Sequence, residues 1–238
     1  MGSIPAVRTT PAWPAALPES PWALQRTDNL LEVSQLHLWR GDRHLLRGLQ
    51  FSVAAGQLLQ LLWPNGTGKT TLLRCLAGFL HAEQGEVRWQ GTNVEKDRDA
   101  FHWDLAYLGH ESALKGDLTA MENLRLSCAL RVPQKAERLR IALEKVGLGS
   151  IDPALPVRSM SAGQKRRVAL ARLSLWHARL WLLDEPATNL DAAGQAVFGK
   201  LLGAHLSGGG LAIVATHRAI ELAGTANRFW VAPQEVPQ

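Results

Sequence analysis

The chain lacks long apolar runs and has few cysteines. None of its hydrophobic stretches approaches the roughly 18 residues that a membrane-spanning helix needs, although 46% of its 238 residues are hydrophobic. Its two cysteines, Cys75 and Cys128, lie far apart without metal-ligand spacing, and the Cys-x-x-Cys-His pattern of haem attachment is absent. These features argue against a membrane span, a disulfide framework, a zinc site and a haem site. We expect both thiols to be reduced in the cytosol.

The charge of the chain is modest and is not clustered. Lys and Arg number 26 against 21 Asp and Glu, which gives a formal net charge of +5 and a pI near 9.6. A basic balance can favour nucleic acid or an anionic membrane face, but here the basic residues are scattered. We therefore favour a solvated basic surface and expect no nucleic-acid partner.

The first 27 residues differ in composition from the rest. They hold five of the twelve prolines, are otherwise rich in alanine and small polar residues, and contain no apolar stretch that could serve as a secretory core. We predict a disordered extension over residues 1–27. Residues 28–238 have a length that suits one elaborated α/β domain.

The hydrophobic pattern of that domain alternates between strands and helices. Apolar and polar positions alternate over residues 30–38 and 46–53 on either side of a turn, which predicts two antiparallel strands, and residues 85–91 suggest another surface strand. Buried strands are predicted at residues 58–62, 180–183 and 211–215. Helices are predicted at residues 70–76, 121–148 with an interruption at Pro133, 164–176 and 192–206. The alternation predicts a mainly parallel sheet with helices on both faces.

A glycine-rich segment follows the strand predicted at residues 58–62. It comprises Trp63, Pro64, Asn65, Gly66, Thr67, Gly68, Lys69, Thr70 and Thr71. Glycines let backbone N–H groups approach phosphate oxygens closely, and the following helix presents its positive end to the same anion. In such loops the lysine bridges the β- and γ-phosphates and the next hydroxyl ligates magnesium. The segment therefore predicts a site for ATP and Mg²⁺ in which Lys69 and Thr70 have these roles.

The first position of this loop departs from the usual pattern, because Trp63 stands where glycine is typical. Pro64 biases its predecessor toward extended backbone, in which tryptophan has no conformational penalty. We expect a negative φ at Trp63 and a formed loop, with the indole beside the phosphate path or folded against the neighbouring strand end. Crowding is then expected to weaken nucleotide binding without abolishing it.

An acidic pair follows the buried strand predicted at residues 180–183. Asp184, at a strand end, can hold magnesium through water, and Glu185 can polarise the attacking water as a general base. An acidic pair on the surface is the alternative. The apolar strand before the pair and Pro186 after it favour the catalytic interpretation.

A short turn before the helix predicted at residues 164–176 offers a hydroxyl and free N–H groups to a phosphate. It consists of Ser161, Ala162, Gly163 and Gln164. In order and spacing, the phosphate loop, this turn, the acidic pair and the later His217 resemble the ATP-binding cassette family over residues 30–231. The resemblance implies a RecA-like P-loop NTPase core with an antiparallel β subdomain and a helical subdomain at about residues 115–175. It also implies a homodimer in which the turn of each chain completes the ATP site of the other.

The resemblance suggests roles for three further residues. His217 resembles the histidine that contacts the γ-phosphate and steadies the catalytic water. Trp39 lies where the family often stacks an aromatic ring on adenine, although a structural tryptophan of the sheet fits equally well. His110 falls where most members carry a glutamine that links magnesium to the membrane partner, and an imidazole there can gain charge near neutral pH.

Within the cassette ATPases, residues 107–110, 114–120 and 161–173 are similar to the cytochrome c maturation ATPases, the CcmA family. Glu111, Ala215 and Arg218 depart from its usual residues. The resemblance implies ATP hydrolysis coupled to haem export or to release of a haem-loaded chaperone. It further implies a CcmB-like membrane permease and haem-handling proteins as partners, at the cytoplasmic face of a bacterial inner membrane. The alternatives are a subunit for another exported substrate and a nucleotide-binding regulator without turnover.

Overall fold

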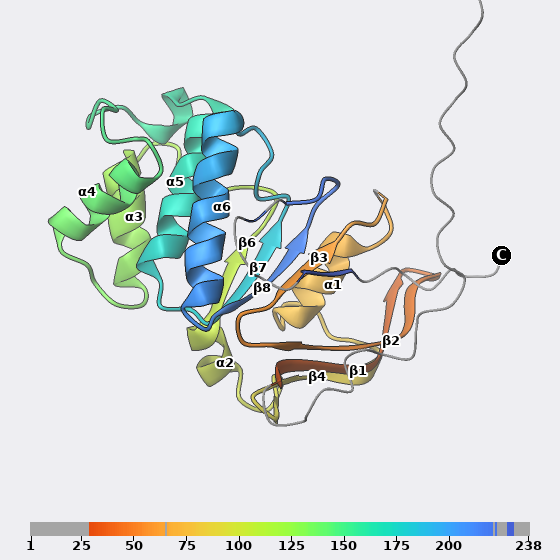
Figure 1. Ribbon diagram of the computed structural model, residues 1–238. Coiled ribbons are helices and arrows are strands. Elements are labelled where there is room, and N and C mark those ends of the chain that lie inside the picture. Colours follow the sequence, from red (N-terminus) through yellow and green to blue (C-terminus); the bar gives the residue numbers. More distant parts are fainter. Residues whose placement is uncertain (1–28, 65, 221, 223–227, 231–238) are drawn as a thin grey trace, which may run out of the picture.

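Two β-sheets form the framework of the computed structural model, one antiparallel and one parallel (Figure 1). The structure describes residues 29–64, 66–220, 222 and 228–230. The extension predicted at residues 1–27 and the loop residue Asn65 lie outside these residues. Among the described residues, none of the helices combines the length and hydropathy that a bilayer crossing requires.

The antiparallel sheet is built mainly from a long hairpin. Its strands, in the order β2-β1-β4-β5, are β1 (Asn29–Arg40), β2 (Arg43–Ala54), β4 (Gln84–Trp89) and β5 (Thr92–Asn93). The last pair of the hairpin joins Arg40 to Arg43, and Gly41 in the turn has a φ of 58°, a conformation that favours glycine. Both strands that the alternation predicts here are confirmed, and the second begins earlier than predicted.

The parallel sheet carries the predicted ATP site at one edge. Its strands, in the order β6-β7-β8-β3-β9, are β3 (Leu58–Leu61), β6 (Leu105–Leu108), β7 (Leu180–Asp184), β8 (Leu211–Ala215) and β9 (Arg228–Trp230). All pairings between these strands are parallel. The carboxyl ends of β3, β7 and β8 therefore lie at the same edge, where open α/β sheets bind ligands.

Helices cover both faces of the parallel sheet (Figure 1). Helix α1 (Lys69–Leu76) lies between the two sheets, and the short α2 (Arg98–Asp104) precedes β6. On the opposite face lie α3 (Ala120–Ala129), α4 (Ala136–Lys145), α5 (Ala162–Leu175) and α6 (Ala192–Ser207). The interruption expected at Pro133 separates α3 from α4. A helical subdomain at residues 115–175 stays a prediction, and α3, α4 and α5 fall within it.

Two hydrophobic cores flank the parallel sheet, and strand β7 contributes to both. Leu180 and Leu182 join the core that α1 shares with the antiparallel sheet. Trp181 and Leu183 join the core beneath α3, α5 and α6. Successive side chains of a strand point to opposite faces, so a strand buried on both faces is apolar at every position. This explains why β8, and β7 from Leu180 to Leu183, are continuous apolar runs in the sequence.

We predict that both thiols of the folded chain react slowly. Cys75 and Cys128 are free and buried; burial raises the pKa of Cys75 to about 12 and raises the pKa of Cys128 above its ordinary value. Because the thiolate is the reactive form, a thiol reagent at pH 8 should modify the native chain slowly and the urea-unfolded chain at once at both positions. Rapid modification of two thiols in the native chain would contradict this packing.

Candidate functional site

The phosphate loop connects β3 to α1 and has the backbone that its glycines allow. Gly66 has a φ of 80° and Gly68, which precedes the helix, a φ of 103°, values that side chains other than glycine rarely accept. The Thr67 hydroxyl donates to the Pro64 carbonyl at 2.7 Å. Gly66, Gly68 and Lys69 line the cavity beyond the loop, so the start of α1 borders a space that suits an anion.

Lys69 lies between the loop and the acidic strand end. Its ammonium donates to the Trp63 carbonyl at 2.6 Å and is 4.0 Å from a carboxylate oxygen of Glu185. The side chain is nearly buried, with 7% of the residue exposed. A cation held between loop carbonyl and carboxylate is placed to bind phosphate oxygens that enter the same space.

Asp184 ends β7 and is joined to the phosphate loop by a hydrogen bond. The Thr70 hydroxyl donates to Asp184 Oδ2 at 2.7 Å, and Asp184 is 2% exposed. A hydroxyl and a carboxylate side by side are hard oxygen ligands of the kind that Mg²⁺ prefers. The two residues predicted as metal ligands therefore meet, and their donor chemistry fits the ion.

Glu185 has a strained backbone and a held side chain. Its φ is 48°, which costs a residue other than glycine roughly 1–3 kcal/mol. Its N–H donates to the Ala215 carbonyl at 2.8 Å, which fixes it to the end of β8. The carboxylate accepts from His217 Nδ1 at 2.9 Å, so the predicted base and the predicted switch histidine are in direct contact.

A cavity of about 510 Å³ brings most of these residues together. It is lined by Arg40, Leu45, Gly66, Gly68, Lys69, Thr70, Thr71, His110, Asp184, Glu185, Thr188 and His217. Pro64, Thr67, Trp39 and Trp63 do not appear among the described residues that line it, and neither does the turn at 161–164. Sequence reasoning missed Arg40, Leu45 and Thr188, because none of them belongs to a motif.

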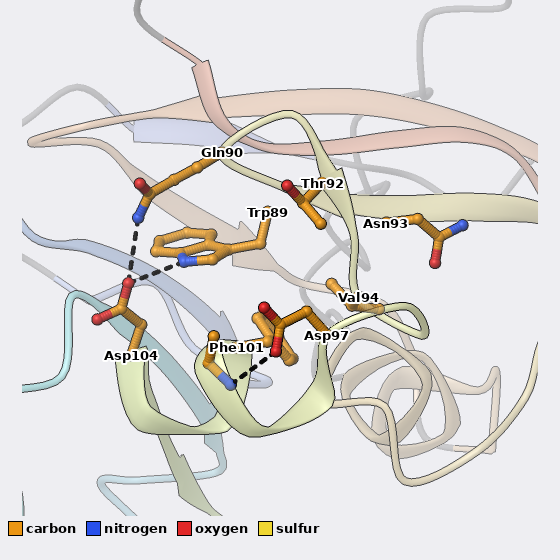
Figure 2. A pocket seen from close by; sticks show the side chains of 9 residues that line it. Trp89, Gln90, Thr92, Asn93, Val94, Asp97, Phe101 and Asp104 are labelled. Carbon is orange, nitrogen blue, oxygen red and sulfur yellow. Dashed lines mark hydrogen bonds between the residues drawn. The ribbon is translucent and has the colours of Figure 1, made fainter.

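A second cavity of about 240 Å³ lies between the antiparallel sheet and α2 (Figure 2). Asp104 accepts there from Trp89 Nε1 at 2.9 Å and from Gln90 Nε2 at 3.1 Å, while Asp97 accepts from the Ala100 N–H at 3.2 Å and caps α2. Both carboxylates thus bind protein donors: Asp104 holds α2 to the antiparallel sheet, and Asp97 caps the helix itself. We assign this cavity no ligand.

The structure places the indole of Trp63 in the hydrophobic core and not beside the phosphate path. Trp63 is 2% exposed and belongs to the core that contains Leu61 and Leu73. Trp63 is not one of the described residues with a positive φ, which agrees with the extended backbone expected before Pro64. Its ring N–H is buried without a hydrogen-bond partner among the described residues. The indole does not line the cavity, which argues against the expected crowding of the nucleotide, and the Trp63 carbonyl accepts from Lys69.

The turn before α5 has a complete capping box. Ser161 Oγ accepts from the Gln164 N–H at 3.1 Å, and the Gln164 side chain accepts from the Ser161 N–H at 2.8 Å. A Cβ on Gly163 would lie 2.8 Å from the Asn189 carbonyl, so only glycine fits there. Ser161 and Ala162 are exposed, which leaves this end of α5 accessible outside the chain's own cavity.

Arg166, which sequence reasoning did not single out, ties α5 to the site. It is 3% exposed, and burial lowers the pKa of its guanidinium to about 10 while the neighbouring acidic charges oppose that shift. The guanidinium donates to five backbone carbonyls, those of Gly109, His110, Asp184, Glu185 and Pro186. One buried cation therefore holds the segment after β6 and the segment after β7 to the helix that begins with Ser161.

Trp39 is stacked against a histidine of its own hairpin. The rings of Trp39 and His44 are 3.6 Å apart at 10°, and His37 continues the stack at 5.9 Å from Trp39. One face of the indole is therefore covered by protein.

We predict that Trp63 stabilises the fold and does not tune nucleotide affinity. Trp63→Gly removes a buried side chain and should lower the free energy of unfolding by roughly 3–5 kcal/mol, whereas Trp63→Phe keeps most of the volume and should cost less than about 1.5 kcal/mol. Urea unfolding measures both, and titration with ATP should give similar dissociation constants for Trp63→Phe and the unaltered chain. A tighter complex with Trp63→Phe would restore the idea of crowding.

Comparisons with known proteins agree with this geometry. The family model described as ABC transporter matches residues 46–188. A cytochrome c biogenesis ATP-binding export protein CcmA from Vibrio vulnificus (strain YJ016) is 46% identical over 190 residues, which cover 79% of this chain and 92% of that protein. A protein of the same name from Methylococcus capsulatus is 46% identical over 200 residues, 83% of this chain and 96% of that protein.

Solved structures show the same fold. A putative ABC transporter ATP-binding protein from Pyrococcus furiosus is similar with a TM-score of 0.72 at 24% identity, over 84% of this chain and 96% of that one. At this identity the likeness supports the fold alone. Family model and curated relatives together show that the chain belongs to the ATP-binding subunits of ABC transporters and, among them, to the CcmA family.

Proposed function

We propose that this chain is the ATP-hydrolysing subunit of an exporter that acts in c-type cytochrome biogenesis. The observation that carries the proposal is the meeting of Lys69, Asp184 and Glu185 at one cavity, in a chain 46% identical to curated CcmA proteins. Binding of ATP follows from membership of the family. The roles of individual residues are part of the proposal.

The triphosphate lies on the loop between β3 and α1, where the helix N-terminus favours negative charge. The Lys69 ammonium, which donates to the Trp63 carbonyl in this structure, binds the β- and γ-phosphates when ATP is present. Thr70 and Asp184 hold Mg²⁺, which when bound neutralises charge that develops on the phosphates during cleavage.

Hydrolysis needs a base beside the γ-phosphate. Glu185 accepts the proton of the attacking water while oxygen bonds to phosphorus and ADP leaves. His217, which holds the Glu185 carboxylate at 2.9 Å, keeps the base oriented and contacts the γ-phosphate. His110 lines the same cavity and replaces the usual glutamine in relaying the state of the site to the membrane partner.

A second copy of the chain completes the site. The exposed capped end of α5, with Ser161 and Ala162 outward, offers N–H groups to a phosphate but lies outside the cavity of its own chain. We propose a head-to-tail homodimer in which Ser161, Ala162, Gly163 and Gln164 of each copy face the ATP of the other.

An apolar surface supports docking of a membrane subunit. Phe79 is 57% exposed and Leu80 40%, and the Phe79 ring packs edge-on to Tyr107 at 5.2 Å. Tyr107 lies in β6, directly before the segment with His110. We propose that a CcmB-like permease binds here at the cytoplasmic face of the inner membrane, and that haem or a haem-loaded chaperone is handled by that permease and its pathway partners.

One of the two residues that suggested a regulator without turnover no longer argues for that alternative. It was suggested by Trp63 and His110, and the Trp63 indole is buried in the core and does not line the cavity. His110 still departs from the family, and it lines the cavity, which supports the proposed relay.

We predict that Glu185→Gln abolishes turnover and keeps ATP binding, because the amide retains the shape and cannot take a proton. Phosphate release by the chain assembled with its membrane partner should fall at least about 100-fold, with an ATP dissociation constant within a few-fold of the original. Cytochrome c formation, read by haem staining in a bacterium that lacks its own CcmA, should be restored by the unaltered chain and not by Glu185→Gln.

The matched control is Glu137→Gln, the same exchange on the exposed face of α4, which should change neither readout. Turnover of Glu185→Gln within a few-fold of the original would exclude Glu185 as the base. Failure of the unaltered chain to restore cytochrome c formation, with its ATPase intact, would point to a different exported substrate.

A further inference from the structure

Arg40 ends strand β1 at the mouth of the nucleotide cavity. Its side chain lines the cavity together with Leu45 of the facing strand. Neither residue belongs to the phosphate loop, the acidic pair or the His110 segment. This part of the hairpin therefore forms a wall of the cavity to which none of the motifs gives a role.

The other walls fix which end of a nucleotide reaches Arg40. The triphosphate is expected on the loop and the start of α1, and its γ end at Glu185 and His217. A Cβ on Gly68 would lie 3.5 Å from Leu45 Cβ and Cδ1, so the hairpin borders the loop directly. A nucleotide with its phosphates on the loop and its γ end toward the acids thus directs its base to the hairpin.

Trp39, the aromatic residue next to Arg40, does not share this cavity. Its ring is stacked on His44 at 3.6 Å, and neither ring is among the described residues that line the cavity. Successive side chains on a strand point to opposite faces, so Trp39 and Arg40 face opposite ways. Of the two neighbours, only Arg40 lines this wall of the cavity, and the stacked Trp39 fits the alternative of a structural tryptophan of the sheet.

We propose that the guanidinium of Arg40, and not the ring of Trp39, is the nucleobase contact of this ATPase. The proposal rests on the proposed function, because it needs ATP on the phosphate loop. A guanidinium is planar and always charged, and it stacks on the faces of aromatic rings and bases. Leu45 adds an apolar contact beside it. Stacking of this kind tolerates different bases, because every base has a π-face.

The test separates a contact to the base from a contact to the phosphates. The full chain and its Arg40→Ala, Arg40→Tyr and Arg40→Lys variants are titrated with ATP and with inorganic tripolyphosphate, which lacks the base. We expect Arg40→Ala to weaken ATP binding about tenfold and tripolyphosphate binding less than about twofold. Arg40→Tyr should restore ATP affinity, since a ring can stack, and Arg40→Lys should not.

Arg43→Ala is the matched control, because it removes the same charge from the paired position of the same hairpin without touching the cavity. It should leave both affinities unchanged. Restoration by lysine but not tyrosine, a parallel loss of tripolyphosphate binding, or no effect of Arg40→Ala would each overturn the inference. Failure of the unaltered chain to bind ATP at all would overturn the proposed function with it, whereas the other outcomes leave that function standing.

Discussion

The hydrogen bond between Thr70 and Asp184 is the contact on which the site depends. It joins residues 114 positions apart in the sequence at 2.7 Å. Because β3 and β7 flank β8 in one parallel sheet, their carboxyl ends lie at the same edge, and the loop after β3 meets the acidic residues after β7. The sheet thus places a cation, a hydroxyl and two carboxylates around one cavity before any nucleotide binds. Such preorganisation is what electrostatic catalysis of phosphoryl transfer needs.

Arg166 extends this arrangement to the helix that begins at Ser161. Its carbonyl contacts include those of Glu185 and His110, so the proposed base and the proposed relay segment are held by one side chain of α5. A buried cation without its partners is costly, and for that reason these segments are expected to move together with α5. The end of α5 that we propose to face a second copy is in this way mechanically connected to the chain's own proposed base.

The sequence predicts those strands, helices and loops that have a regular hydrophobic pattern or a recognisable motif. Strands buried on both faces are apolar at every position, and β7 and β8 were found in this way. The glycines of the loop and the place of Glu185 after a buried strand follow from motifs, whereas the positive φ of Glu185 appears only in the structure. Short elements such as α2 and β9 lack a periodic signal, and they were missed because tertiary contacts define them.

The direction of individual side chains is the part of the site that motifs in the sequence do not predict. Trp63 and Trp39 both stand in motif positions, and in both cases the ring packs on protein, in the core for Trp63 and on His44 for Trp39. Large aromatic rings gain most from burial, so packing decided their orientation. Arg40 and Arg166 were overlooked for the converse reason, because single arginines are usually solvated and only the fold shows what these two contact.

The most direct test of the account mixes two inactive chains. Lys69→Ala removes the phosphate cation and Ser161→Arg blocks the end of α5, so either variant assembled alone with the membrane partner should fail to hydrolyse ATP. In a mixed dimer, one site combines the intact loop of one copy with the intact α5 end of the other, and partial hydrolysis should return. Full activity of Ser161→Arg alone, or no activity in the mixture despite confirmed mixed dimers, would contradict a site built from two copies of this chain.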